Sequence, residues 1–196
     1  MGGPGSVIAL PPDRSTAREP SVAYTWGSTP AERELRFACD RYLVEPDSVC
    51  FRAISVRAPA AVVFRWLCQL RATPYSYDWL DNLGRGSPQT LTPGLEQLEL
   101  GQTLMTMFEL VEFERDRHIT LLAHRFRWVF GDVCVTYLVA PSGEADSRIV
   151  VKLLGRFRTA PGRLLLKPTM PWLDLFMMRR QLLNLKGLAE RDARAG

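Results

Sequence analysis

The stretch PWLDLFMMRRQLLNLKGLAER, residues 171–191, predicts the long helix on which the fold depends. Apolar side chains at helical spacing lie within one narrow arc of a 3.6-residue wheel: Leu175, Met178, Leu182, Leu185 and Ala189. In the first two turns, Trp172, Leu173, Phe176 and Met177 extend the apolar surface almost all round. We therefore expect a C-terminal helix that begins at Pro171 and whose first half is largely enclosed.

The residues before this helix alternate as strands with one buried face do. Strands are predicted over residues 50–58, 102–113, 119–130, 133–140 and 148–157, with hairpin turns between the last four. In the last of them Ile149, Val151 and Leu153 share one face, whereas Arg148 and Lys152 lie on the other. The pattern predicts an antiparallel sheet packed against the C-terminal helix.

Helices are predicted at three earlier places. Thr29, Pro30 and Glu32 form a helix-start signature. Residues 59–70 place apolar side chains at helical spacing, and a second short helix is predicted over residues 79–84, ended by Gly84. A sheet that curls around a long helix tends to leave a gap beside it, so we expect a pocket there.

Composition limits the class of protein. The chain has 196 residues, 46% of them hydrophobic, and a net charge of +4. Residues 1–22, rich in Gly, Pro and Ser, are expected to be a flexible leader before a single domain at residues 23–194. Basic residues are not gathered into a stripe, so no nucleic-acid partner is expected. No apolar run is long enough to span a bilayer, so no integral membrane association is expected.

The cysteines and histidines do not suggest a metal site. Cys39, Cys50, Cys68 and Cys134 are widely spaced, and the two histidines are not set at ligand spacing. We expect buried free thiols in a reducing cytoplasm, with no metal and no cofactor.

The aromatic segment Tyr75-Ser76-Tyr77-Asp78-Trp79 is the first candidate site. Aromatic residues at this density serve either as a structural plug or as a gate whose hydroxyls orient a ligand. At helical spacing, Tyr75 and Trp79 share a face, so only some of these side chains can touch one ligand.

Other candidates come from the predicted strands. Glu109 alternates with Met105 and Met107 in a predicted strand. If Glu109 lies in a pocket, its pKa would rise, which suits a general acid or base. The alternative is that Glu109 is exposed or paired with an arginine. His124 is expected to share a strand face with Trp128. Methionines would give an adaptable lining.

Several stretches together resemble the SRPBCC superfamily, in particular an uncharacterised bacterial subgroup: TWGSTPAE (25–32), FACD (37–40), RAISVRAPAAVVFRWLCQL (52–70), YSYDWLDNLGR (75–85), LELGQ (98–102) and FMMRRQLLNLKGLAER (176–191). This superfamily includes START domains, Bet v 1-like proteins and polyketide cyclase-dehydrases. The resemblance implies an α+β helix-grip fold, with the segment from Tyr75 to Leu83 at the mouth of a cavity between sheet and helix.

The expected function is binding or carriage of a small hydrophobic molecule, lipid-like or polyketide-like, by a monomer or homodimer. The residues expected to line the site are Tyr75, Tyr77, Trp79, Met105, Met107, His124, Trp128, Tyr137, Trp172, Phe176 and Met178. One alternative is a polyketide cyclase or dehydratase, with Glu109 or Tyr77 moving a proton. The other is a protein-interaction adaptor without a ligand.

Overall fold

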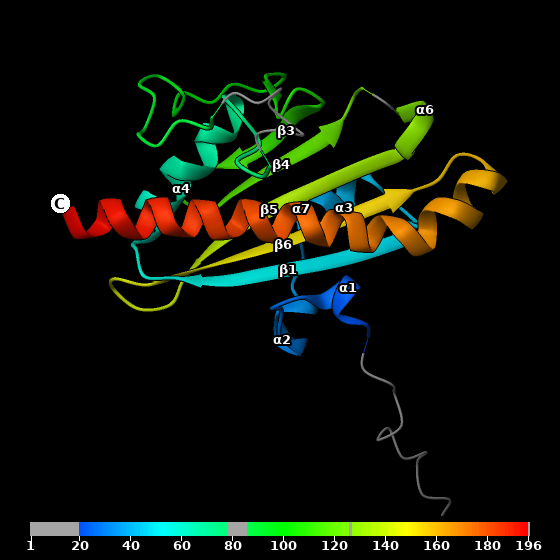
Figure 1. Ribbon diagram of the computed structural model, residues 1–196, viewed down its shortest axis with the longest axis horizontal. Helices are drawn as coiled ribbons and strands as arrows, with labels where there is room; N and C mark the ends of the chain where they lie inside the picture. The colour runs from blue at the N-terminus through cyan, green and yellow to red at the C-terminus, as the bar shows by residue number, and fades with distance from the viewer. Residues whose placement is uncertain (1–19, 78–85, 126, 196) are drawn as a thin grey trace, which may run out of the picture.

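The computed structural model describes residues 20–77, 86–125 and 127–195. Its elements follow one another along the chain as α1 (Val22–Thr25), α2 (Pro30–Arg33), α3 (Cys39–Tyr42), β1 (Ser48–Val56), α4 (Ala60–Cys68), the 3-10 turn η2 (Gln69–Arg71), β2 (Thr103–Leu104), β3 (Phe108–Glu114), β4 (His118–Ala123), α6 (Arg127–Phe130), β5 (Asp132–Pro141), β6 (Ser147–Arg156) and α7 (Ala160–Ala195) (Figure 1).

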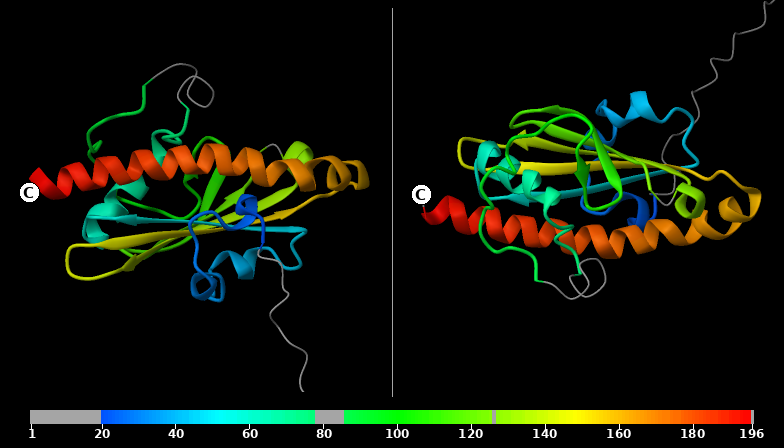
Figure 2. Two further views of the ribbon diagram at one scale, coloured as in Figure 1. Left: turned by 60° about the horizontal axis from the view of Figure 1, so that its bottom comes forward. Right: turned by 90° about the horizontal axis from the view of Figure 1, so that it is seen from above.

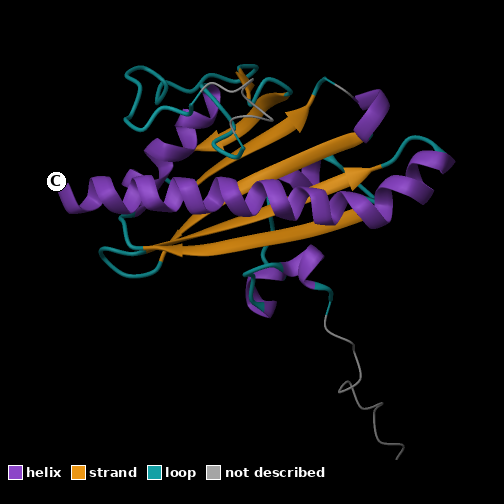
Figure 3. Cartoon of the chain, viewed as in Figure 1, coloured by secondary structure: helices purple, strands orange, loops and turns teal. Residues whose placement is uncertain are grey.

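The described part of the chain forms a six-stranded antiparallel sheet in the order β1-β6-β5-β4-β3-β2. Strands β2 to β6 follow each other as a meander, and β1 closes the order by pairing with β6 over its full length, from Ser48 opposite Gly155 to Val56 opposite Ser147. The long helix α7 runs across one face of this sheet (Figures 1 and 3). The predicted α+β helix-grip architecture is confirmed.

Helix α7 and α4 cover one face of the sheet, and the main core lies between them and the strands. Its largest buried side chains include Trp66, Tyr137, Leu121, Ile149 and Leu182. None of the helices in the described ranges has the length and apolar content needed to span a bilayer.

The N-terminal segment covers the opposite face. Phe37, Cys39 and Leu43 pack there against Phe51 and Val150 in a second buried cluster. Figure 2 (right) shows α7 on one side of the sheet and α3, in light blue, on the other. Strands β1, β5 and β6 therefore bury side chains on both faces.

The same N-terminal segment also shields the edge strand β1. The backbone N–H of Ala53 donates to the carbonyl of Trp26 at 3.0 Å. Gly27 has a φ of +73°, and a Cβ there would lie 2.0 Å from the Ala53 carbonyl oxygen, so only glycine fits this approach. The predicted helix start at Thr29 is confirmed at α2, where Thr29 and Glu32 form a capping box. Covering the edge in this way removes a site of strand-to-strand aggregation.

The predicted strand over residues 102–113 was wrong in extent. Met105 and Thr106 have φ values of +48° and +61°, which break the run into β2 and β3. A register shift between Leu110 and Glu112 then reverses the alternation in the second half of β3. Phe108 and Leu110 face the main core, so the predicted single face from Met105 to Phe113 does not exist.

Two further boundaries differ from the prediction. The strand predicted over residues 119–130 ends at Ala123, and the chain then leaves the sheet to form α6. Helix α7 begins at Ala160, eleven residues before Pro171, although it contains Pro168 and Pro171. Pro171 cannot donate to the carbonyl of Lys167, and the Tyr24 hydroxyl donates to that oxygen instead at 3.5 Å. The short helix predicted over residues 79–84 lies outside the described residues.

Candidate functional site

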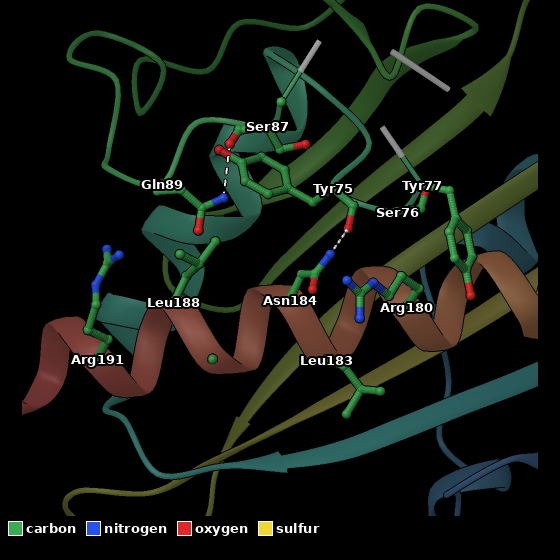
Figure 4. Close-up of a pocket in the computed structure, with 12 residues that line it drawn as sticks. Tyr75, Ser76, Tyr77, Ser87, Gln89, Arg180, Leu183, Asn184, Leu188 and Arg191 are labelled. Atoms are coloured by element: carbon green, nitrogen blue, oxygen red, sulfur yellow. Dashed lines mark hydrogen bonds between the residues drawn. The ribbon is translucent and has the colours of Figure 1, made fainter. Parts of the chain in front are cut away.

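A groove of about 750 Å³ lies between α7 and the loop segments on either side of residues 78–85. From the loops, the lining residues are Tyr75, Ser76, Tyr77, Gly86, Ser87 and Gln89, and from α7 they are Arg180, Leu183, Asn184, Gly187, Leu188 and Arg191 (Figure 4). Residues 86–102 form neither helix nor strand (Figure 3), so the wall opposite α7 is loop. The groove has the size of a small-molecule site.

Side-chain amides on α7 hold the loop in place. The Asn184 Nδ2 donates to the carbonyl of Tyr75 at 2.8 Å, and the Gln181 Nε2 donates to the carbonyl of Pro74 at 2.6 Å. These bonds support Tyr75 in a left-handed conformation with a φ of +56°. The Tyr75 ring is buried edge-on against Trp66, with centroids 6.1 Å apart. The loop is thus built onto α7 and α4 rather than hanging free.

Two further contacts shape the mouth of the groove. The Tyr77 and Phe176 rings are stacked, with centroids 4.4 Å apart and planes 8° from parallel. The hydroxyls of Thr73 and Ser87 lie 3.1 Å apart, which joins the two arms of the loop behind the tyrosines. Aromatic surface therefore faces the groove at one end, next to the polar side chains of α7.

Behind the groove, Gln181 is the centre of a buried polar cluster. The Tyr137 hydroxyl donates to the Gln181 Oε1 at 2.7 Å and contacts the Met178 Sδ at 3.5 Å. The Gln181 Nε2 lies 3.3 Å from the Met105 Sδ. Burial raises the pKa of Tyr137, so its hydroxyl stays protonated and available as a donor. These side chains occupy the space between sheet and helix where an internal cavity was predicted.

A buried ion pair lies farther toward the N-terminal end of α7. The Arg52 guanidinium, from β1, is fully buried and donates to Asp174 Oδ2 at 2.7 Å and to the Pro171 carbonyl at 3.0 Å. Burial raises the pKa of Asp174, and the adjacent guanidinium offsets this only in part. This pair clamps the first half of α7 onto the edge strand.

The structure brings together part of the predicted site. Tyr75 and Tyr77 line the groove, with Phe176 stacked on Tyr77. Met105, Tyr137 and Met178 meet around Gln181, directly behind it. Gln181 itself was not predicted, although it lies three residues after Met178 and four before Leu185, on the buried arc of the helix.

Other predicted residues lie elsewhere. His124 and Trp128 were expected on a strand face, but both follow the end of β4 and are exposed, Trp128 by 84%. Trp172 and Phe176 were expected to be enclosed, yet 55% and 51% of their surfaces are exposed. Met107 is half-buried beside the end of β4, where its carbonyl accepts from the His124 N–H at 3.0 Å. Trp79 lies outside the described residues.

Glu109 does not reach the groove. It is half-buried on β3, opposite Thr103 and Leu122 in the sheet. Its neighbours Phe108 and Leu110 point toward the α7 side, so Glu109 points to the other face of the sheet.

The described side chains that line the groove are aromatic, aliphatic, amide, hydroxyl and guanidinium groups. None of the twelve described residues that line it is Asp, Glu or His. The buried thiols are unreactive, because burial raises the pKa of Cys39 to about 11 and of Cys68 and Cys134 to about 12. Within the described ranges, no three His, Cys, Asp or Glu side chains are grouped as metal ligands.

No protein-family model and no curated protein sequence matches the chain. Solved structures share its fold at low sequence identity. A hypothetical protein from Helicobacter pylori is 15% identical, with a TM-score of 0.50, over 79% of this chain and 95% of that one. A START superfamily protein from Mycobacterium smegmatis is 14% identical, with a TM-score of 0.48, over 73% of this chain and 97% of that one.

Norcoclaurine synthase from Thalictrum flavum, solved with dopamine and hydroxybenzaldehyde, is 12% identical, with a TM-score of 0.45, over 80% of this chain and 94% of that one. The strand order, with β1 beside β6, and the long helix packed across the sheet are the features that define the architecture. The chain has a helix-grip fold, in which a long C-terminal helix packs across a six-stranded antiparallel sheet.

Proposed function

We propose that the chain binds a small amphipathic molecule in the groove between α7 and the tyrosine loop. The observation that carries this proposal is the lining itself: aromatic rings at one end, aliphatic side chains from α7, and amide, hydroxyl and guanidinium groups between them. Such a lining suits a ligand with an apolar body and a polar or anionic end.

The aromatic and aliphatic side chains would cover the apolar body. Tyr77, already stacked on Phe176, offers one ring face, and Leu183 and Leu188 offer aliphatic surface. Burying apolar ligand surface contributes about 25 cal/mol for each Å² removed from water, less the cost of ordering the ligand.

The polar groups of the groove are donors suited to an anionic or carbonyl-bearing end. Arg180 and Arg191 both line the groove from α7, about three turns apart, and Gln89 lines it from the loop (Figure 4). Arg191 also donates to Asp192 at 2.7 Å, which leaves Arg180 as the stronger candidate for pairing with a ligand anion.

The site proposed here adjoins the internal cavity that was predicted rather than coinciding with it. Tyr137, Met178 and Gln181 occupy the region between sheet and helix. A ligand in the groove would lie against Tyr75 and Asn184, on the outer side of this cluster.

Binding is favoured over acid-base catalysis of the cyclase type. A cyclase needs a general acid or base within hydrogen-bond reach of its substrate. Of the two predicted candidates, Glu109 points to the opposite face of the sheet, and Tyr77 lines the groove with its ring stacked on Phe176.

Gly187 gives a direct test of the groove. It lines the groove from the exposed side of α7, and a Cβ added there meets nothing within 4 Å. Gly187→Trp would therefore fill the groove without a clash in the helix, and Gly187→Ala is the matched control that leaves it open. Calorimetric titration with decanoate, decanol and 1-naphthoate would measure binding.

We expect wild type and Gly187→Ala to bind at least one probe with equal affinity, and Gly187→Trp to bind it about tenfold or more weakly. Equal binding by all three proteins would place the ligand elsewhere. No binding of any probe to wild type would count against the proposed ligand class.

A further inference from the structure

Apart from Tyr77, which stacks on Phe176, the described residues leave the apolar outward face of the first half of α7 exposed. We call this surface the exposed apolar stripe: Leu164, Leu165, Trp172, Leu173 and Phe176, which are between 47% and 77% exposed. The members lie on the side of the helix away from the sheet, because Asp174 and Met178 take the inward positions in the same turns. This corrects the prediction that the first half of the helix is enclosed.

The stripe is held outward by specific contacts rather than by chance rotation of the helix. Arg52 fixes Asp174 and the Pro171 carbonyl against β1, so Trp172 and Leu173 must point away from that strand. Rotating the helix to bury them would expose the charged pair and break its hydrogen bonds.

Cations outnumber acids along the stripe. Between residues 160 and 189 the basic residues are Arg163, Lys167, Arg179, Arg180 and Lys186, whereas Asp174 is the sole acid. Asp174 is paired with Arg52, Arg163 with Asp47, and Lys186 with Glu190. Among the ion pairs of the described residues, none involves Lys167, Arg179 or Arg180, so these three cations carry the positive charge beside the stripe.

The neighbouring helix α6 also combines an exposed apolar side chain with nearby cations. It packs against α7 and carries Trp128, the most exposed of the large hydrophobic residues. Beside it, Arg127, Arg156 and Arg158 surround the lone carboxylate of Asp132, which leaves an excess of positive charge.

We propose that this surface docks the protein onto an anionic membrane, with the exposed apolar stripe and Trp128 in the headgroup layer. Leu, Trp and Phe on one face, bordered by Lys and Arg, is the pattern of helices that lie in the interface of an anionic bilayer. Each cation near such a surface adds to the attraction, and salt screens it.

The charges decide against a second copy of the chain as the partner. A two-fold interface would place the same cations opposite one another, and Asp174, the sole acid of residues 160–189, is already paired with Arg52. An anionic bilayer would bury the apolar side chains of the stripe and pair its negative headgroups with the cations beside the stripe. Docking does not depend on whether the groove binds a ligand.

Vesicle flotation with purified full-length protein tests the proposal. The vesicles are phosphatidylcholine alone, or equal parts of phosphatidylcholine and phosphatidylglycerol, at low and at physiological ionic strength. The stripe variant is Leu165→Gln/Trp172→Gln. Its matched control, Val44→Gln/Leu100→Gln, changes two other exposed apolar residues, each 65% exposed, outside α6 and α7.

We expect wild type and the control to float with the phosphatidylglycerol vesicles and not with phosphatidylcholine alone, and added salt to weaken the binding. The stripe variant should bind about tenfold or more weakly, while its circular dichroism and Tm match those of wild type. The proposal is overturned if wild type does not float with anionic vesicles, or if the stripe variant floats equally well. It is also overturned if sedimentation velocity shows a wild-type dimer that the stripe substitutions dissociate.

Discussion

Replacing Asp174 by alanine should destabilise the protein more than any single change on the surface of α7. Asp174 is the one carboxylate that pairs with the Arg52 guanidinium, and Arg52 has none of its side-chain surface exposed. Without Asp174, a positive charge stays buried between β1 and the helix. The guanidinium would keep its bonds to the carbonyls of Phe51 and Pro171, at 2.8 and 3.0 Å, which soften the loss but carry no net charge.

The size of the effect follows from the burial of the pair. Removing one partner of a buried ion pair costs about 3–5 kcal/mol, because the other charge is left uncompensated. The two remaining carbonyl bonds place Asp174→Ala near the lower end, at about 3 kcal/mol. For a chain of this length, that corresponds to a fall in Tm of roughly 6–12 °C.

Urea unfolding followed by circular dichroism would measure the loss, with Asp146→Ala, an exposed turn substitution, as the control. The double variant Arg52→Met/Asp174→Leu removes both charges and should recover most of the stability. If Asp174→Ala stays within about 0.5 kcal/mol of wild type, or if the double variant is no more stable than Asp174→Ala, the buried pair does not clamp α7.

Three shorter predictions follow from single features. Gly187→Ala should stabilise the protein by about 0.5–1 kcal/mol, because the new methyl group meets nothing within 4 Å and alanine favours the helix; a lower urea midpoint would contradict this. A thiol reagent at pH 7 should label no cysteine in the native protein and all four in urea, since each is buried; rapid native labelling would contradict the packing around Cys68, whose pKa burial raises to about 12. Burial acts to raise the pKa of Asp132, but hydrogen bonds from Arg158 and Arg127 outweigh burial, and the pKa is lowered. The Asp132 carboxylate therefore contributes its full stabilisation above about pH 4, the ordinary aspartate range. This contribution is lost as the pH falls below that range. Asp132→Asn should therefore unfold at lower urea than wild type at pH 7, and the gap should narrow toward pH 2; a gap that is constant with pH would refute this.

The architecture could be predicted because it depends on periodic patterns. The alternation of Ile149, Val151 and Leu153 and the apolar arc at Met178, Leu182 and Leu185 both describe faces that pack against the main core, and the structure confirms them. The helix start at Thr29 could also be predicted, because the residue types that mark it are local in the sequence.

The breaks in the strands could not be predicted, because they depend on long-range contacts. Met105 and Thr106 take left-handed conformations that neither residue favours, and the Met105 N–H donates to the Leu70 carbonyl at 3.0 Å. After Ala123, an apolar run that looks like a strand turns into α6. Gly131 then returns the chain to the sheet with a φ of +77°, where a Cβ would lie 2.2 Å from the Arg156 carbonyl oxygen.

The site was predicted in part for a similar reason. Tyr75, Tyr77, Met105, Tyr137 and Met178 were chosen by residue type, and the structure gathers them along the groove and around Gln181. An apolar half-helix such as Trp172 to Met177 suggests enclosure, since periodicity cannot tell a face packed against protein from one left to another partner. The burial of Arg52 could not be predicted either, because its partner, Asp174, lies 122 residues away in the sequence.

The position of a bound probe tests the central claim most directly. In ¹⁵N–¹H spectra, titration with decanoate should shift the side-chain amides of Gln89 and Asn184 and the backbone amide of Gly187, all of which line the groove. The side-chain amide of Gln102, which lies outside the groove, should stay in place. Shifts confined to residues outside the groove, or no shifts with any amphipathic probe, would contradict the proposal that α7 and the tyrosine loop form a ligand-binding site.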